Sequence, residues 1–299
     1  MAEPVLMFGV GATKAGTSWL YRYLAEHPDC AMPAVKELHF FNTLENGQVL
    51  ARMDQLTESR TRHRERMRKA ENGTPKFAAQ KARVEGHDQL MALIGNGLDV
   101  DRYMAWMSEI RGDRALVGDI TPAYSLMGEK MLRRMAGLRG GMRPRFVFLM
   151  RDPVARLWSN VRMVAARRVG SRDQGKLAQA AVEEMRAALD RPRNPAMLRS
   201  DYAGMIARLD RAVPAEATYL GFYEELFSKP EIDRLCAFLG LRAAPAKFDR
   251  IQHAGVHVDL PEDLAADARR ALAPQYTAVE ARMGRIPAKW NDMRMKVQG

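Results

Sequence analysis

A short segment near the start of the chain has the residue types that bind a phosphate group. Residues 11–16 (GATKAG) follow an apolar run and are followed by two hydroxyl residues and an amphipathic run at helical spacing. A strand, a small-residue loop and a helix N-terminus direct backbone N–H groups toward one point, where the helix dipole adds positive charge. We expect the ligand contacts to come from Thr13, Lys14, Ala15, Gly16, Thr17 and Ser18.

This segment departs from the Walker A loop of nucleoside triphosphatases at one position. The Walker pattern has a lysine directly after its second glycine, whereas here Thr17 follows Gly16 and the lysine is Lys14, inside the loop. A lysine at that place would lie beside the first bound phosphate instead of reaching over a triphosphate. The alternative is an ordinary turn between a strand and a helix. The strand context, Lys14 and the hydroxyl pair together favour phosphate binding.

A second candidate group follows another apolar run, residues 145–150. Arg151 comes directly after it, Asp152 is suited to cap a helix, and Pro153 is suited to the first turn of that helix. Ser159 lies two turns further along. In α/β folds, nucleotides bind at the carboxyl edge of the sheet, so Arg151 and Ser159 can face the same crevice.

The two segments resemble those of sulfotransferases that use 3′-phosphoadenosine 5′-phosphosulfate (PAPS). Residues 11–29 (GATKAGTSWLYRYLAEHPD) are similar to the 5′-phosphosulfate loop of that family, and residues 151–163 (RDPVARLWSNVRM) to its 3′-phosphate element. The resemblance implies that Arg151 and Ser159 bind the 3′-phosphate. It also implies an α/β fold of the P-loop NTPase-like, three-layer kind, with a central parallel sheet flanked by helices. The resemblance does not extend to residues 44–100, which we expect to be a helical insertion.

Residues 36–41 (KELHFF) resemble a segment of the heparan-type members of this family. The resemblance implies that Glu37 is the catalytic base and that His39 assists it, while Lys36 helps to hold the sulfonate. Asp119 is the reserve candidate for the base. Taken alone, the hexapeptide would be interpreted as a surface turn with scattered charges.

Sulfuryl transfer is an in-line displacement that depends mainly on positioning and charge stabilisation, as phosphoryl transfer does. We therefore expect Lys14 to stabilise the charge that develops on the departing 5′-phosphate, and we expect no metal ion to be required. The acceptor would be a hydroxyl or amine, and Glu37 with His39 favours a carbohydrate or glycoconjugate, including an anionic saccharide.

The chain departs from the family pattern at two places. Asp119-Ile120 stands where heparan-type members have a Glu-Lys pair, so Ile120 replaces a lysine. Residues 254–256 (AGV) stand where relatives have Lys-Gly-Arg. Candidate substitutes for those cations are Arg250, His253 and His257. These departures keep open a degenerate member that binds nucleotide without transferring sulfate. A P-loop kinase or NTPase is the other alternative.

The expected organisation is a single domain over residues 1–299. Further strands are predicted at residues 115–120 and 218–222 from their apolar runs. Residues 44–100 form an insertion, predicted as a solvated helix with a loop, because arginines crowd residues 60–68 and apolar residues are sparse. A surface that steers an anionic acceptor is the less favoured interpretation. Residues 250–299 are expected to form a lid or tail over the nucleotide.

Composition places the chain among basic globular proteins. It has 299 residues, a net charge of +11 and 47% hydrophobic residues, which favours anionic partners such as nucleotides. Aromatic residues are not interleaved with basic patches as in nucleic-acid-binding modules, so no nucleic acid is expected. The two cysteines show no metal or disulfide spacing, and there is no leader-like or membrane-spanning run. We expect a cytoplasmic protein.

Overall fold

The computed structural model describes residues 3–170, 173–191, 193–249 and 258–290. A five-stranded sheet, with every neighbouring pair parallel, has the order β2-β3-β1-β4-β5. The strands are β1 (Val5–Gly11), β2 (Cys30–Ala31), β3 (Leu116–Ile120), β4 (Arg143–Met150) and β5 (Thr218–Phe222). The four predicted strands are confirmed. The two-residue β2 was not predicted, because it is too short to show an apolar pattern.

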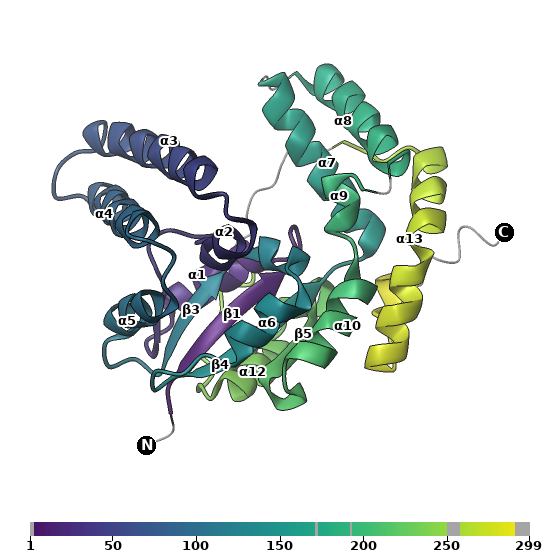
Figure 1. Cartoon of the computed structure of the whole chain (residues 1–299). Coiled ribbons are helices and arrows are strands. Elements are labelled where there is room, and N and C mark those ends of the chain that lie inside the picture. Colours follow the sequence, from purple (N-terminus) through teal and green to yellow (C-terminus); the bar gives the residue numbers. More distant parts are fainter. Residues whose placement is uncertain (1–2, 171–172, 192, 250–257, 291–299) are drawn as a thin grey trace.

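The central strand β1 is where the direction of the connections reverses. It pairs with β3 on one side and with β4 on the other, so that Val5 aligns with both Leu116 and Arg143. All seven residues of β1 are buried, as expected for a parallel strand covered on both faces. Helices lie on both sides of the sheet (Figure 1). The loops after β1 and β4 therefore leave the carboxyl edge beside each other, where α/β folds bind ligands.

The helices that cover the sheet and extend from it follow in chain order. They are α1 (Thr17–Glu26), α2 (Phe40–Asn46), α3 (Val49–Arg68), α4 (Pro75–Gly95), α5 (Val100–Arg111), η1 (Pro122–Leu126), α6 (Glu129–Ala136), α7 (Pro153–Val169), α8 (Gln174–Leu189), α9 (Pro195–Leu198), α10 (Tyr202–Ala212), η2 (Ala215–Ala217), α11 (Tyr223–Leu226), α12 (Lys229–Leu239) and α13 (Glu262–Met283).

Two helix pairs extend beyond the sheet, α3 with α4 on one side and α7 with α8 on the other (Figure 1). The α3–α4 pair is the predicted insertion, and the expectation of one solvated helix with a loop was wrong. Residues 75–95 form a second long helix, which buries Leu90, Leu93 and Ile94, and α3 buries Leu56. The arginines at positions 62, 64, 66 and 68 are exposed, as predicted.

Short helix α2 is anchored in the core by two aromatic side chains. Phe40 and Phe41 are fully buried. The Phe41 ring packs edge-on against Phe8 of β1, with centroids 5.6 Å apart, and against Tyr103 of α5 at 5.0 Å. This packing confirms that the segment before α2 is held close to the sheet. In the described part of the chain, no helix combines the length and apolar character needed to cross a membrane.

Candidate active site

The predicted phosphate loop connects β1 to α1 at the carboxyl edge of the sheet. Gly16 is the N-cap of α1 and has φ 86°, a left-handed conformation that glycine adopts without steric cost. A side chain at this position would also collide with Leu226, whose Cδ2 lies 2.8 Å from the position of a Cβ. Thr17 and Ser18 begin the helix, so their amides are among those with no partner inside it. The loop therefore directs donors outward.

Lys14 lies at the centre of a concentration of positive charge. Burial lowers the pKa of the Lys14 ammonium, and the nearby charges of Arg151, Arg162, Arg167 and Lys36 lower it further. The four neighbouring charges that act on Lys14 are all positive. These positive charges repel one another in the free protein, and an anion bound at the outward-facing amides of the loop would offset that repulsion. The arrangement therefore fits a ligand with several negative charges.

The structure brings Arg151 to this loop. Its guanidinium donates to the Lys14 carbonyl oxygen over 3.5 Å and lies over the ring of Tyr223, 4.6 Å from the centroid. The hydroxyl of Tyr202 fixes the Arg151 backbone, since it donates to the Arg151 carbonyl over 2.8 Å. Ser159 lies on α7, half-buried, and its hydroxyl has no hydrogen bond to the residues that the structure describes. Both side chains are available to a ligand.

Asp152 fixes the turn that carries Arg151. One carboxylate oxygen of Asp152 accepts from the Ala155 amide over 2.7 Å, which caps α7 as the sequence predicts. The other oxygen accepts from the Tyr276 hydroxyl of α13 over 2.7 Å. Burial raises the pKa of Asp152, while these hydrogen bonds and the charge of Arg151 oppose that rise. The C-terminal helix thus supports the strand-to-helix junction at the site.

Lys36, Glu37 and His39 form one contiguous group, as predicted. The Lys36 ammonium donates to one oxygen of Glu37 over 3.1 Å, and Nε2 of His39 lies 3.4 Å from the other oxygen. Nδ1 of His39 lies 3.1 Å from the side-chain oxygen of Asn42. The side chain of Glu37 is 42% exposed, so it remains open to an acceptor.

The charge state of Glu37 follows from these contacts. Burial alone would raise the pKa of its carboxyl, but the hydrogen bond with His39 and the charge of Lys36 outweigh burial and lower the pKa to about 2. Lys36 also acts on Lys14. Lys36 is thus in direct contact with Glu37, and its charge has a smaller effect on Lys14 in the phosphate loop.

Three residues of this site have an unusual backbone conformation. Among the described residues, the non-glycine residues with left-handed φ are Lys14 at 72°, Glu37 at 67° and His39 at 55°. This conformation costs a non-glycine residue roughly 1–2 kcal/mol. Such strain persists only where the surrounding structure imposes it, and it clusters at functional sites. All three belong to the set predicted to be catalytic.

Asp119 lies behind the site and not on its surface. It is 0% exposed, and its oxygens accept from the hydroxyls of Thr121 and Tyr124 over 2.7 Å each and of Tyr103 over 3.2 Å. Burial raises its pKa against these hydrogen bonds. Thr121 also accepts from the His39 amide over 3.4 Å. Asp119 is thus joined to the Glu37–His39 segment through Thr121, with no exposed atom that could reach an acceptor.

The lysine missing at position 120 is replaced by a packed apolar side chain. Ile120 is 2% exposed, and its side-chain carbons lie 2.9 Å from where a Cβ of Gly9 would be. The substitutes considered for the tail cations, Arg250, His253 and His257, lie outside the described residues, as do residues 254–256.

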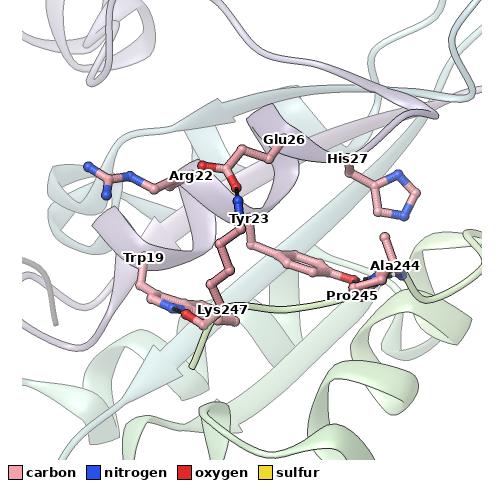
Figure 2. Close-up of a pocket in the computed structure, with 8 residues that line it drawn as sticks. All are labelled: Trp19, Arg22, Tyr23, Glu26, His27, Ala244, Pro245 and Lys247. Carbon is pink, nitrogen blue, oxygen red and sulfur yellow. Dashed lines mark hydrogen bonds and ion pairs between the residues drawn. The ribbon is translucent and has the colours of Figure 1, made fainter. Parts of the chain in front are cut away.

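Two side chains at the site were missed from the sequence. Tyr223 follows β5 directly and lies against both Arg151 and Gly16, so its place after a strand was a usable signal. Arg52 of α3 donates to the backbone of the Glu37 segment, and no motif marks it. A separate pocket lies along α1 and is lined by none of the predicted residues; Figure 2 shows Trp19 and Tyr23 in it beside Lys247.

Comparison with known proteins gives the family of this chain. A sequence profile described as the Sulfotransferase family matches residues 6–245. The chain belongs to the sulfotransferase family. No curated protein matches it significantly. The crystal structure of a sulfotransferase from Alicyclobacillus acidocaldarius is 24% identical, with a TM-score of 0.58, covering 97% of this chain and 100% of that one. This likeness confirms the predicted P-loop-like fold.

A second solved structure is the sulfotransferase domain from the curacin biosynthetic pathway. It is 16% identical to this sulfotransferase, with a TM-score of 0.47, covering 100% of this chain and 98% of that one. Membership in the family implies a nucleotide donor and an acceptor, and PAPS is the donor that the family generally uses.

Proposed function

We propose that this sulfotransferase moves the sulfuryl group of PAPS to a hydroxyl or amine of an acceptor, which is a carbohydrate or glycoconjugate. The observation that carries the proposal is the position of Lys36, whose charge acts both on Lys14 in the phosphate loop and on Glu37. Lys36 contacts Glu37 at 3.1 Å, and its effect on Lys14 supports a phosphate loop and a carboxylate that belong to one site. In-line transfer requires that arrangement, because donor and acceptor must meet on one axis.

The phosphate loop and the Arg151 turn would hold the donor. Thr13, Ala15, Gly16, Thr17 and Ser18 supply backbone and hydroxyl donors to the 5′-phosphosulfate. Arg151 and Ser159 bind the 3′-phosphate, a role supported by the Ser159 hydroxyl, which has no other described partner. Charge-assisted hydrogen bonds of this kind are the strong ones in anion recognition.

Glu37 and Lys14 act at the two ends of the transfer. The acceptor oxygen forms its bond to sulfur as the bond between sulfur and the 5′-phosphate oxygen breaks. Glu37 takes the proton from the acceptor hydroxyl, and Lys14 stabilises the charge left on the departing phosphate. When Lys36 turns toward the sulfonate, Glu37 loses a charge that keeps its pKa low, and it becomes a stronger base. His39 orients the carboxylate.

Asp119 has a positioning role in this proposal. Its full burial and its three hydroxyl partners favour Glu37 over Asp119 as the base, because a general base must come within hydrogen-bond reach of its proton.

The first experiment measures donor binding by calorimetry with 3′,5′-ADP and with Mg-ATP. We expect binding of 3′,5′-ADP without metal, weakened by Arg151→Ala and Ser159→Ala. Arg168→Ala is the matched control, since Arg168 lies on α7, as Ser159 does, and pairs with Glu183. A preference for Mg-ATP would replace this proposal with a kinase or NTPase.

The second experiment measures transfer of labelled sulfuryl groups from PAPS to a panel of oligosaccharides, phenols and aliphatic alcohols. We expect Glu37→Gln to reduce transfer by about 100- to 10,000-fold while binding of 3′,5′-ADP is retained. Binding of 3′,5′-ADP without transfer to any acceptor would favour a degenerate member of the family.

A further inference from the structure

The helical insertion contacts the candidate active site through its first turns. Arg52 lies in the first turn of α3, four residues after Gln48, which is the N-cap of that helix. Its Nη2 donates to the carbonyl oxygens of Glu37 over 2.8 Å and Leu38 over 3.0 Å. Its Nη1 donates to the side chain of Gln55 over 3.3 Å, which orients the guanidinium from the same helix.

The two carbonyl groups that Arg52 binds lie within the strained part of the site. Leu38 stands between Glu37 and His39, and both of these have left-handed φ, at 67° and 55°. On one side the segment is held by burial, since Leu38 is 1% exposed. On the other side it is held by the guanidinium. A backbone conformation that is unfavourable for non-glycine residues needs such external bonds to persist.

The guanidinium is partly buried at this place. Burial lowers the pKa of Arg52, while the nearby Tyr124, Glu37 and Asp119 raise it. Its Nε atom is buried and has no hydrogen-bond partner in the described part of the chain. A charged group held in this way is fixed in position, because any movement would separate it from the carbonyl oxygens that compensate its burial.

We propose that Arg52 is a positioning residue, which holds Glu37 and His39 in the geometry needed for proton transfer. The inference rests on the proposed function. Through the guanidinium of Arg52, the α3–α4 pair helps to shape the active site. The exposed arginines of α3 are not part of this role.

The competing explanation is that Arg52 only attaches α3 to the rest of the molecule. Other contacts also secure the insertion. Leu56, Leu90 and Ile94 are buried at no more than 2% exposure, and Arg60 pairs with Asp88 across the two helices at 2.6 Å. Loss of Arg52 should therefore leave the helices in place.

The test compares Arg52→Gln, Arg52→Lys and the control Arg60→Gln, which removes a cation of the same helix that does not touch the Glu37 segment. Transfer is measured with the acceptor of the panel that the wild-type chain sulfates fastest. We expect Arg52→Gln to reduce the rate about 100-fold, since small displacements of a catalytic group have effects of that size. Arg52→Lys should restore part of it. Affinity for 3′,5′-ADP should change less than twofold.

A second measurement does not depend on turnover. The imidazole resonances of His39, assigned by comparison with His39→Asn, report its contact with Glu37. We expect these resonances to shift in Arg52→Gln and not in Arg60→Gln. The acid limb of the pH–rate profile should move upward in Arg52→Gln, because a displaced Glu37 loses the contacts that keep its pKa low.

Equal rates, equal acid limbs and equal His39 resonances in Arg52→Gln and Arg60→Gln would overturn the inference. So would a parallel loss of donor affinity and rate, which indicates general disruption. A wild-type chain that binds 3′,5′-ADP but transfers nothing would refute the proposed function alone, and the His39 resonances would still decide whether Arg52 holds this segment.

Discussion

Replacement of Lys14 by methionine separates two effects of the lysine charge, which are its unfavourable effect on the stability of the free protein and its contribution to the transfer rate. The ammonium is partly buried among Arg151, Arg162, Arg167 and Lys36, and burial with these charges lowers its pKa. Methionine has a similar unbranched length, and the left-handed backbone at φ 72° costs both residues alike. The variant therefore removes the charge and leaves the loop conformation unchanged.

The expected loss of activity follows from the proposed role of Lys14 at the leaving group. One preorganised donor to a developing oxyanion typically contributes about 3–4 kcal/mol. Since 1.36 kcal/mol is a factor of ten, Lys14→Met should reduce the transfer rate about 150- to 900-fold. The temperature of unfolding should stay the same or rise, because one of several mutually repelling charges is gone. Activity should thus fall without a loss of stability.

The assay measures single-turnover transfer from labelled PAPS at saturating donor, together with thermal unfolding without ligand. Lys69→Met is the control, because Lys69 is an exposed residue at the far end of α3. A rate for Lys14→Met within about threefold of the control would refute the role of Lys14 at the leaving group. A marked drop in unfolding temperature would refute the interpretation of the charge cluster as unfavourable in the free protein.

Two further predictions concern Glu37 and its surroundings. In Lys36→Met the pKa of Glu37 should rise from about 2, because the charge and hydrogen bond of Lys36 are lost. In the proposed mechanism Glu37 acts as an ionised base, so activity is lost as pH falls through its pKa. The acid limb of the pH–rate profile should therefore move upward in Lys36→Met, and an unchanged limb would contradict the proposed role of Glu37. Asp119→Asn should lower the free energy of unfolding by about 1–3 kcal/mol, because one acceptor oxygen replaces two and a buried hydroxyl loses its partner. Denaturant unfolding measures this change, with Asp113→Asn on the exposed surface as the control, and equal stability of the two variants would contradict it.

The fold and the donor side of the site could be predicted because their signals are local. The strand, loop and helix around Lys14 are contiguous, and Arg151 follows directly after a strand. The rule that parallel strands place their carboxyl ends on one edge is enough to bring these two segments together. The structure confirms their proximity, since Arg151 reaches the Lys14 carbonyl.

Other features depend on packing that the sequence does not display. The burial of Asp119 depends on the hydroxyl groups of Tyr103 and Tyr124, which come from two separate helices. The second helix of the insertion was missed because its polar and apolar residues form no strong stripe, and the packing of α4 along α3 supplies the stabilisation. Arg52 is one arginine among many, and only the fold distinguishes it.

The absence of lysine at position 120 has a structural explanation that also clarifies the role of Lys36. The Ile120 side chain fills the space left by Gly9, and it lies in the interior of the sheet, where an ammonium group would be costly to bury. In the proposed mechanism, a cation near the reacting groups must then come from another element. We propose that Lys36 meets this need from the loop before α2, where it contacts Glu37 directly and its charge has a smaller effect on Lys14. Because Glu37 and His39 share that loop, the bonds from Arg52 that hold it also determine where Lys36 lies. The proposed base and Lys36 are therefore positioned together, and a single displacement of this loop would weaken proton transfer and the proposed contact of Lys36 with the sulfonate at once, while the sites for the two phosphates of 3′,5′-ADP stay intact.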